Sequence, residues 1–200
     1  MEIKEIESKE RTITIFNDVD ESSMSADIEK IFQINQSDEE WIRNLYNILN
    51  ASCAKFDSSV VEMPHIQVLL STYGGDVYDG LSLYDAIKNS NTEVDITFDI
   101  TCFGKIMSMG IIILLASKNR KAYRNTTFMI HEISSGAIGK LADLEESVDE
   151  AKRLNKVLFD IIEKETRITK SQLEEIYNKK QDWFITAEEA LKLGIITEII

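Results

Sequence analysis

Six short runs along the chain predict β-strands. Residues 12–16 alternate apolar and polar positions and are rich in β-branched side chains, a pattern typical of a half-buried strand. Residues 65–71 are almost continuously apolar, as expected of a parallel strand covered on both faces. The other predicted strands lie at residues 94–100, at 121–124 and 127–130 on either side of a turn at Asn125, and at 195–197.

Apolar residues elsewhere recur at intervals of three and four, which predicts helices. Two helices are expected in the first third of the chain, at residues 26–33 and 37–55. The second begins at a capping box, Ser37 followed by Glu40, and is expected to bury Trp41, Leu45, Ile48 and Leu49. Further helices are predicted at 77–87, at about 140–165, from the Thr169/Gln172 box, and from the Thr186/Glu189 box to just before Gly194.

The order of these elements predicts the architecture. Strand, Gly-Gly turn, helix, strand and helix alternate through the middle of the chain, which indicates an α/β fold. No Gly/Ser-rich linker divides the sequence, so a single domain spanning residues 1–200 is expected, with residues 1–10 forming a flexible N-terminus. The helix at 140–165 is longer than one small domain needs, and part of its apolar stripe is therefore expected to meet another subunit.

Composition excludes several classes of protein. The net charge is −13 with no basic block, which argues against nucleic-acid binding. No apolar run reaches membrane-spanning length and the N-terminus lacks the apolar centre of a signal peptide. Cys53 and Cys102, with two histidines in the whole chain, argue against a metal site and suit a reducing cytosol. A cytoplasmic protein without a metal or a membrane partner is expected.

Residues 101–110 form an apolar stretch with the hydroxyl of Ser108 near its centre. The chain is expected to turn at a glycine from a strand into a buried helix, which places Ser108 in the first helical turn. Unpaired N–H groups there favour a developing negative charge, so the position suits an acyl-transfer nucleophile. It equally suits a serine that caps a core helix.

A serine nucleophile requires a base, a group that orients the base, and an oxyanion hole. His65 precedes a buried strand, whereas His131 ends the predicted strand at 127–130 and can face a cleft. Gly74 and Gly75 follow a strand and can present backbone N–H groups, although a tight turn explains them as well. The acidic partner stays open, because the chain offers many carboxylates.

Four segments together resemble the proteolytic subunit of the Clp protease, ClpP. Residues 71–87 look like the family's Asn-Ser-Pro-Gly-Gly segment with the helix that follows, and residues 102–110 match its nucleophile motif with Ser-Met-Gly intact. Residues 128–131 match its histidine motif, and residues 182–196 are similar to its C-terminal signature. The segments occur in the family's order over about residues 66–200.

The resemblance implies a serine peptidase with a catalytic triad. Ser108 is then the nucleophile, His131 the general base and afterwards the general acid, and Asp182 the group that orients His131. The backbone N–H groups of Gly75 and Met109 are expected to bind the oxyanion. An extended polypeptide substrate is expected to add as a strand beside Gly74, Ser135, Gly136, Ala137 and Gly139.

The same resemblance implies a crotonase-like spiral of ββα units with the helix at 140–165 as a protruding handle. Two heptameric rings are expected to meet through these handles as a homo-oligomeric tetradecamer. An AAA+ unfoldase partner would spend the ATP and deliver unfolded polypeptides, and the peptidase itself needs no cofactor.

Departures from the family leave alternatives open. Tyr73 replaces the usual Pro, Glu132 and Ile133 replace Gln-Pro after the histidine, and the N-terminal third matches least. Alternation along the chain argues against Glu132 facing His131. The alternatives are a non-catalytic ring subunit, a ClpP-like viral prohead maturation protease, and an acyl-CoA-processing enzyme of the crotonase superfamily.

Overall fold

The protein, seen here in a computed structural model, is built on one seven-stranded sheet. The structure describes residues 11–51, 64–90, 96–134, 138–179 and 181–200, so the predicted flexible N-terminus lies outside it. Five strands pair in parallel in the order β1-β2-β3-β4-β7. They are β1 (Thr12–Ile15), β2 (Ile66–Thr72), β3 (Phe98–Met107), β4 (Asn119–Ala122) and β7 (Glu198–Ile199).

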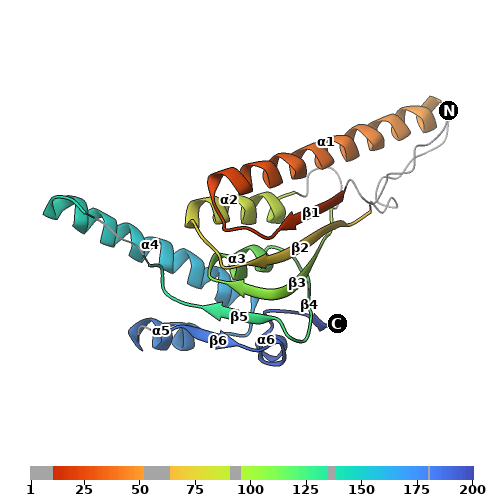
Figure 1. Cartoon of the computed structure of the whole chain (residues 1–200). Helices are drawn as coiled ribbons and strands as arrows, with labels where there is room; N and C mark the ends of the chain where they lie inside the picture. The colour runs from red at the N-terminus through yellow and green to blue at the C-terminus, as the bar shows by residue number, and fades with distance from the viewer. Residues whose placement is uncertain (1–10, 52–63, 91–95, 135–137, 180) are drawn as a thin grey trace.

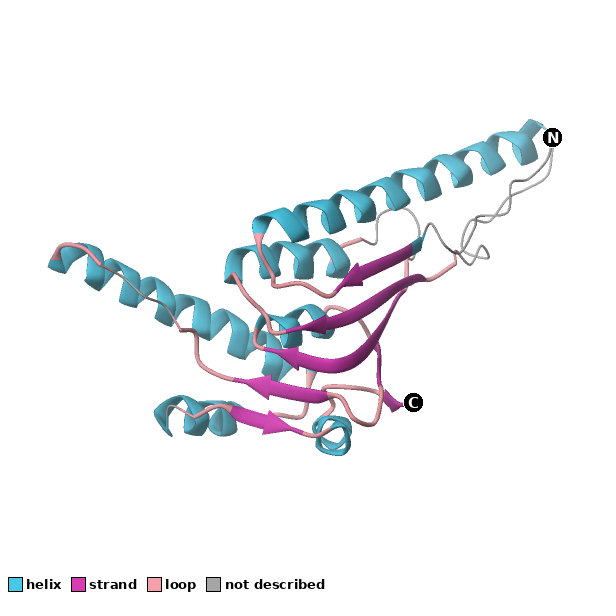
Figure 2. Ribbon diagram, viewed as in Figure 1, coloured by secondary structure: helices cyan, strands magenta, loops and turns pink. Residues whose placement is uncertain are grey.

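Two further strands continue the sheet beyond the end of β4. β5 (Thr127–Ile130) pairs in parallel with the last residues of β3, and β6 (Trp183–Ile185) pairs antiparallel with β5. Helices α2 (Val77–Lys88) and α3 (Met109–Leu115) follow β2 and β3, as parallel connections require. All seven residues of α3 are buried, so this helix forms the centre of the core (Figure 2).

The N-terminal third differs from the two predicted helices. One helix, α1 (Glu21–Ala51), runs through the whole segment, and its first turn is capped by Asp20, whose Oδ1 accepts from the Ser23 N–H at 2.9 Å. The predicted start at Ser37 is wrong because Asp38 is buried and receives two hydrogen bonds from the Arg11 guanidinium, at 2.7 and 3.0 Å. This pair fixes the middle of the helix against the residue before β1.

The buried face of α1 also differs from the predicted one. Trp41 and Leu45 are only half-buried and Ile48 is exposed, whereas the side chain of Leu49 lies outside the described residues. The helix buries a different set on the core side: Met24, Ile31, Ile34 and Ile42.

The C-terminal helices confirm the predicted periodicity. They are α4 (Leu141–Glu165), α5 (Lys170–Lys179) and α6 (Ala187–Leu193), which ends at Gly194 in the left-handed conformation. The N-terminal half of α4 projects from the body on one side, and α1 extends toward the other (Figure 1). The strand predicted at 195–197 is wrong: Ile195 and Ile196 form a buried turn, and pairing begins at Glu198.

Candidate active site

The candidate nucleophile lies where β3 gives way to α3. The expected turn at a glycine is wrong, because Gly104 (φ 69°) is a bulge residue inside β3 and the chain turns at Ser108 itself. Ser108 has φ 52° and is the only non-glycine residue with positive φ in the described part of the chain. Its N–H donates to Met129 O at 2.9 Å, which ties this conformation to β5.

Ser108 therefore holds the cap position of α3 without capping it. Its side chain makes no capping hydrogen bond, so the capping interpretation does not explain the residue. Positive φ in a residue with a Cβ costs on the order of 1–3 kcal/mol, and such strain concentrates at functional sites. The hydroxyl is left available for another purpose.

Gly74 and Gly75 form the opposite side of the site, directly after β2. Both have positive φ, and a Cβ on Gly74 would lie 2.7 Å from Ser108 Cβ. A Cβ on Gly75 would lie 2.2 Å from Val19 O. Only glycine allows the backbone of this segment to approach both the serine and the chain before α1.

His131 and Asp182 come together through the β5–β6 pair. Ile130, the last residue of β5, pairs with Trp183, the first residue of β6, so the register continued by one residue sets His131 opposite Asp182. The carboxyl ends of β3 and β5 and the amino end of β6 thus meet at one edge of the sheet. Ser108, His131 and Asp182 each stand at one of these ends.

A pocket of about 70 Å³ opens at this edge. Ser108, Met109, Gly75 and His131 all line it, and Asp182 does not. Within the residues that the structure describes, no hydrogen bond joins the side chains of Ser108, His131 and Asp182. The structure thus brings these residues into one neighbourhood in the isolated chain, without linking them by hydrogen bonds.

The predicted substrate segment is only partly described. Gly74 lies against Ser108, whereas Gly139 is outside the pocket lining and packs beside Asp143 at the start of α4. Ser135, Gly136 and Ala137 lie outside the described residues, so their predicted role stays a prediction.

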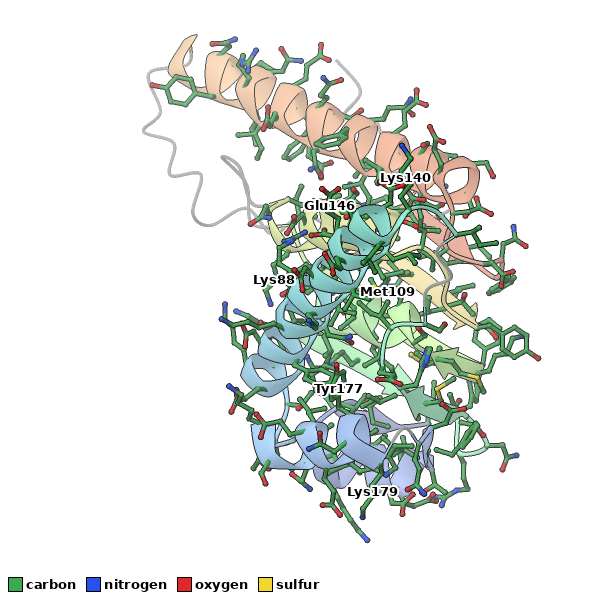
Figure 3. All side chains as sticks on the ribbon, turned by 90° about the vertical axis from the view of Figure 1, so that its left-hand side faces the viewer. Lys88, Met109, Lys140, Glu146, Tyr177 and Lys179 are labelled. Carbon is green, nitrogen blue, oxygen red and sulfur yellow. The ribbon has the colours of Figure 1, made fainter. Side chains whose placement is uncertain are left out.

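Helix α4 contributes to the site in a way that the sequence analysis missed. Its C-terminal half lines the pocket through Leu158, Phe159 and Ile162. Helical periodicity correctly predicted that this stripe is apolar. However, part of it was expected to contact another subunit rather than the pocket. In Figure 3, α4 crosses the view diagonally with Met109 beside it.

Two polar contacts fix α4 to both sides of the pocket. The buried Asn155 accepts through Oδ1 from the Ile133 N–H at 3.1 Å, two residues after His131. On the other side, Tyr78 Oη donates to Glu150 Oε1 at 2.5 Å, three residues after Gly75.

The carboxylate of Glu150 is held in its charged form. Arg153 donates to both of its oxygens, at 2.7 and 2.6 Å, and this pair, followed by the Tyr78 hydrogen bond, lowers the pKa of Glu150 to about 2. The same Glu150 hydrogen bond raises the pKa of Tyr78, because deprotonation would break it.

Other kinds of site find little support in the described residues. No three His, Cys, Asp or Glu side chains among them gather as metal ligands would. None of the helices described here is both long and apolar enough to cross a bilayer.

The fold is that of ClpP proteins. The structure matches that of a ClpP1 point mutant from Listeria monocytogenes with a TM-score of 0.73 over 96% of this chain and 92% of that one, at 20% sequence identity. The family model for Clp protease matches residues 57–200. The chain belongs to the Clp protease family.

Relatives of known name agree with this assignment. The chain is 35% identical over 156 residues to the ATP-dependent Clp protease proteolytic subunit of Deinococcus radiodurans, covering 77% of this chain and 73% of the relative. It is 33% identical over 138 residues to proteolytic subunit 2 of Chlamydia trachomatis, covering 68% of this chain and 64% of the relative. The predicted resemblance and the ClpP-like α/β fold are confirmed.

Proposed function

We propose that this chain is a serine endopeptidase subunit that cleaves polypeptides through Ser108, His131 and Asp182. The observation that carries the proposal is the convergence of these residues at adjoining ends of β3, β5 and β6. Ser108 and His131 face one pocket there with Gly75 and Met109. The strained backbone of Ser108, which serves no capping purpose, is a second support.

The chemistry follows from the roles of these groups. His131 accepts the proton of Ser108 Oγ as the oxygen attacks the scissile carbonyl carbon, and the backbone N–H groups of Gly75 and Met109 donate to the oxyanion. His131 then gives the proton to the leaving amine. Water, activated by the same imidazole, releases the acyl group. Asp182 keeps the imidazole in the productive orientation, and catalytic hydrogen bonds often shorten only when substrate is bound.

The substrate is an extended, unfolded polypeptide added beside Gly74 and Gly139, with residues 135–137 completing the segment. Backbone pairing of this kind tolerates many sequences. The relatives are named as subunits of an ATP-dependent protease, which supports an AAA+ unfoldase as the partner. We further propose a cytoplasmic homo-oligomer of two heptameric rings, in which the projecting half of α4 is the handle.

Labelling with a fluorophosphonate tests the proposal directly. The probe should attach to Ser108, and Ser108→Ala should lower peptide cleavage by about 10⁴–10⁶-fold, as loss of a triad member does in serine proteases. An assembled protein that takes no label and cleaves no peptide is instead a non-catalytic ring subunit. This alternative is favoured by the missing hydrogen bonds among the three side chains.

Cleavage assays without an ATPase separate a prohead maturation protease from an unfoldase-dependent peptidase, since both should take the label. The segment before residue 57 lies outside the family match, which favours the former. A labelled protein that cleaves a folded scaffold protein without an ATPase would be of that kind.

A further inference from the structure

The pocket beside Ser108 is lined mainly by apolar side chains. Helices α3 and α4 and strand β5 contribute six uncharged side chains to this lining. They are Ile111 and Ile112 of α3, Ile130 of β5, and Leu158, Phe159 and Ile162 of α4.

One acidic residue belongs to this lining. Glu132, directly after His131, is the only acidic residue among the described residues that line the pocket, and it is half-buried. Within the described part of the chain no cation or hydrogen-bond donor pairs with it. Two arginines and one lysine of the described residues pair with other carboxylates: Arg153 with Glu150, Lys88 with Glu165, and Arg124 with Glu188.

A half-buried carboxylate without a partner is stabilised by a ligand that supplies one. Lysine and arginine side chains complement such a pocket. Their methylene groups can pack on its apolar side chains while the charged end pairs with a carboxylate. A neutral side chain would leave Glu132 without a partner, and an acidic one would be repelled by it.

We propose that Glu132 makes this site selective for Lys or Arg at the substrate residue whose carbonyl is attacked. The inference rests on the proposed function, since it assigns a side-chain preference to the same site. Ser108 and Glu132 line the same pocket, so the side chain that enters it is expected to belong to the residue that is acylated on Ser108.

The test uses short fluorogenic peptides that differ only at this residue, with Lys, norleucine or Glu. Norleucine keeps the stem of lysine and removes its charge. For the full-length protein, kcat/KM for Lys should exceed that for norleucine by about tenfold, the ratio that one charge-assisted hydrogen bond of about 1.4 kcal/mol gives. The Glu peptide should be the poorest substrate.

Two variants of the same position isolate the carboxylate. Glu132→Gln should bring the Lys/norleucine ratio close to one, and Glu132→Lys should favour the Glu peptide. The matched control is Glu174→Gln on α5, an exposed carboxylate outside the pocket, which should leave every ratio unchanged. Thermal unfolding of each variant verifies that it folds.

The outcomes separate this inference from the proposed function. A protein that takes the fluorophosphonate label and cleaves all three peptides at similar rates, or prefers norleucine with and without Glu132, keeps its peptidase function and overturns the selectivity. A Lys preference that survives in Glu132→Gln also overturns it. Absence of label and cleavage overturns both.

Discussion

Asn155, on α4, is expected to position His131, which follows β5. Its Oδ1 accepts from the Ile133 N–H at 3.1 Å, and its side chain is only 8% exposed. Leucine has the same branching at Cγ but no acceptor, so Asn155→Leu leaves that N–H unpaired at a half-buried position. The expected cost in unfolding free energy is about 1–3 kcal/mol.

The expected effect on catalysis is larger than the effect on stability. Released from α4, the segment after β5 can shift relative to Ser108, and a misplacement of about 1 Å in catalytic geometry costs on the order of 10²-fold in rate. Asn155→Leu should therefore lower kcat by about ten- to a hundredfold with little change in KM. The rate of fluorophosphonate labelling of Ser108 should fall in parallel, because it depends on the same base.

Two control variants and one contrary outcome test the role of Asn155. Asn155→Asp keeps an acceptor at the same place and should restore most of the activity. Ser147→Ala, on the same helix, removes a hydroxyl that bonds only Asp143 O at 2.8 Å and should leave kcat unchanged. If Asn155→Leu lowers the urea midpoint but leaves kcat and the labelling rate intact, Asn155 serves stability alone.

Three further predictions concern stability and reactivity. Arg11→Met should cost about 3–5 kcal/mol in urea unfolding, because it leaves the Asp38 carboxylate buried without its partner; the double variant with Asp38→Leu should recover most of this loss, and no recovery would contradict the pairing. Burial raises the pKa of the Cys102 thiol, so Ellman's reagent at pH 8 should react with it only after unfolding. Burial raises the pKa of Asp27 to about 6, so the folded state binds more protons between about pH 4 and 6 and stability falls as pH rises through that window. Asp27→Asn should remove this slope and add roughly 1 kcal/mol at pH 7, discounted for partial exposure; an unchanged slope would show that Asp27 ionises normally.

Apolar spacing and capping boxes correctly predicted helices where no distant contact changes the local structure. α4 was predicted from its three-and-four spacing, and α6 from a capping box that forms, with the Glu189 carboxylate accepting from the Thr186 N–H at 2.9 Å. The Ser37–Glu40 box does not start a helix, because α1 is continuous from Glu21 to Ala51; Asp38 instead pairs with Arg11, 27 residues earlier. A pattern of four residues contains no information about such a partner.

The candidate site divides in the same way. Ser108, His131 and the Gly74–Gly75 turn could be chosen from local chemistry, whereas Asp182 followed only from the family resemblance. In space, Asp182 is selected by the β5–β6 register, which a three-residue strand cannot reveal on its own. The pocket wall from α4 was missed because the spacing of an apolar stripe does not say which surface covers it.

The main chain at Val19 holds the Gly74–Gly75 turn of the candidate site. Val19 N–H donates to Gly74 O at 2.9 Å and Val19 O accepts from the Asp76 N–H at 2.7 Å, so the peptide groups that flank Gly75 are gripped from both sides. These bonds involve only backbone atoms, but the Val19 side chain is also buried in the core, so both the path of the chain and the residue at position 19 are constrained. Shortening the protein beyond Val19 would remove the backbone contacts that hold the Gly74–Gly75 turn in place.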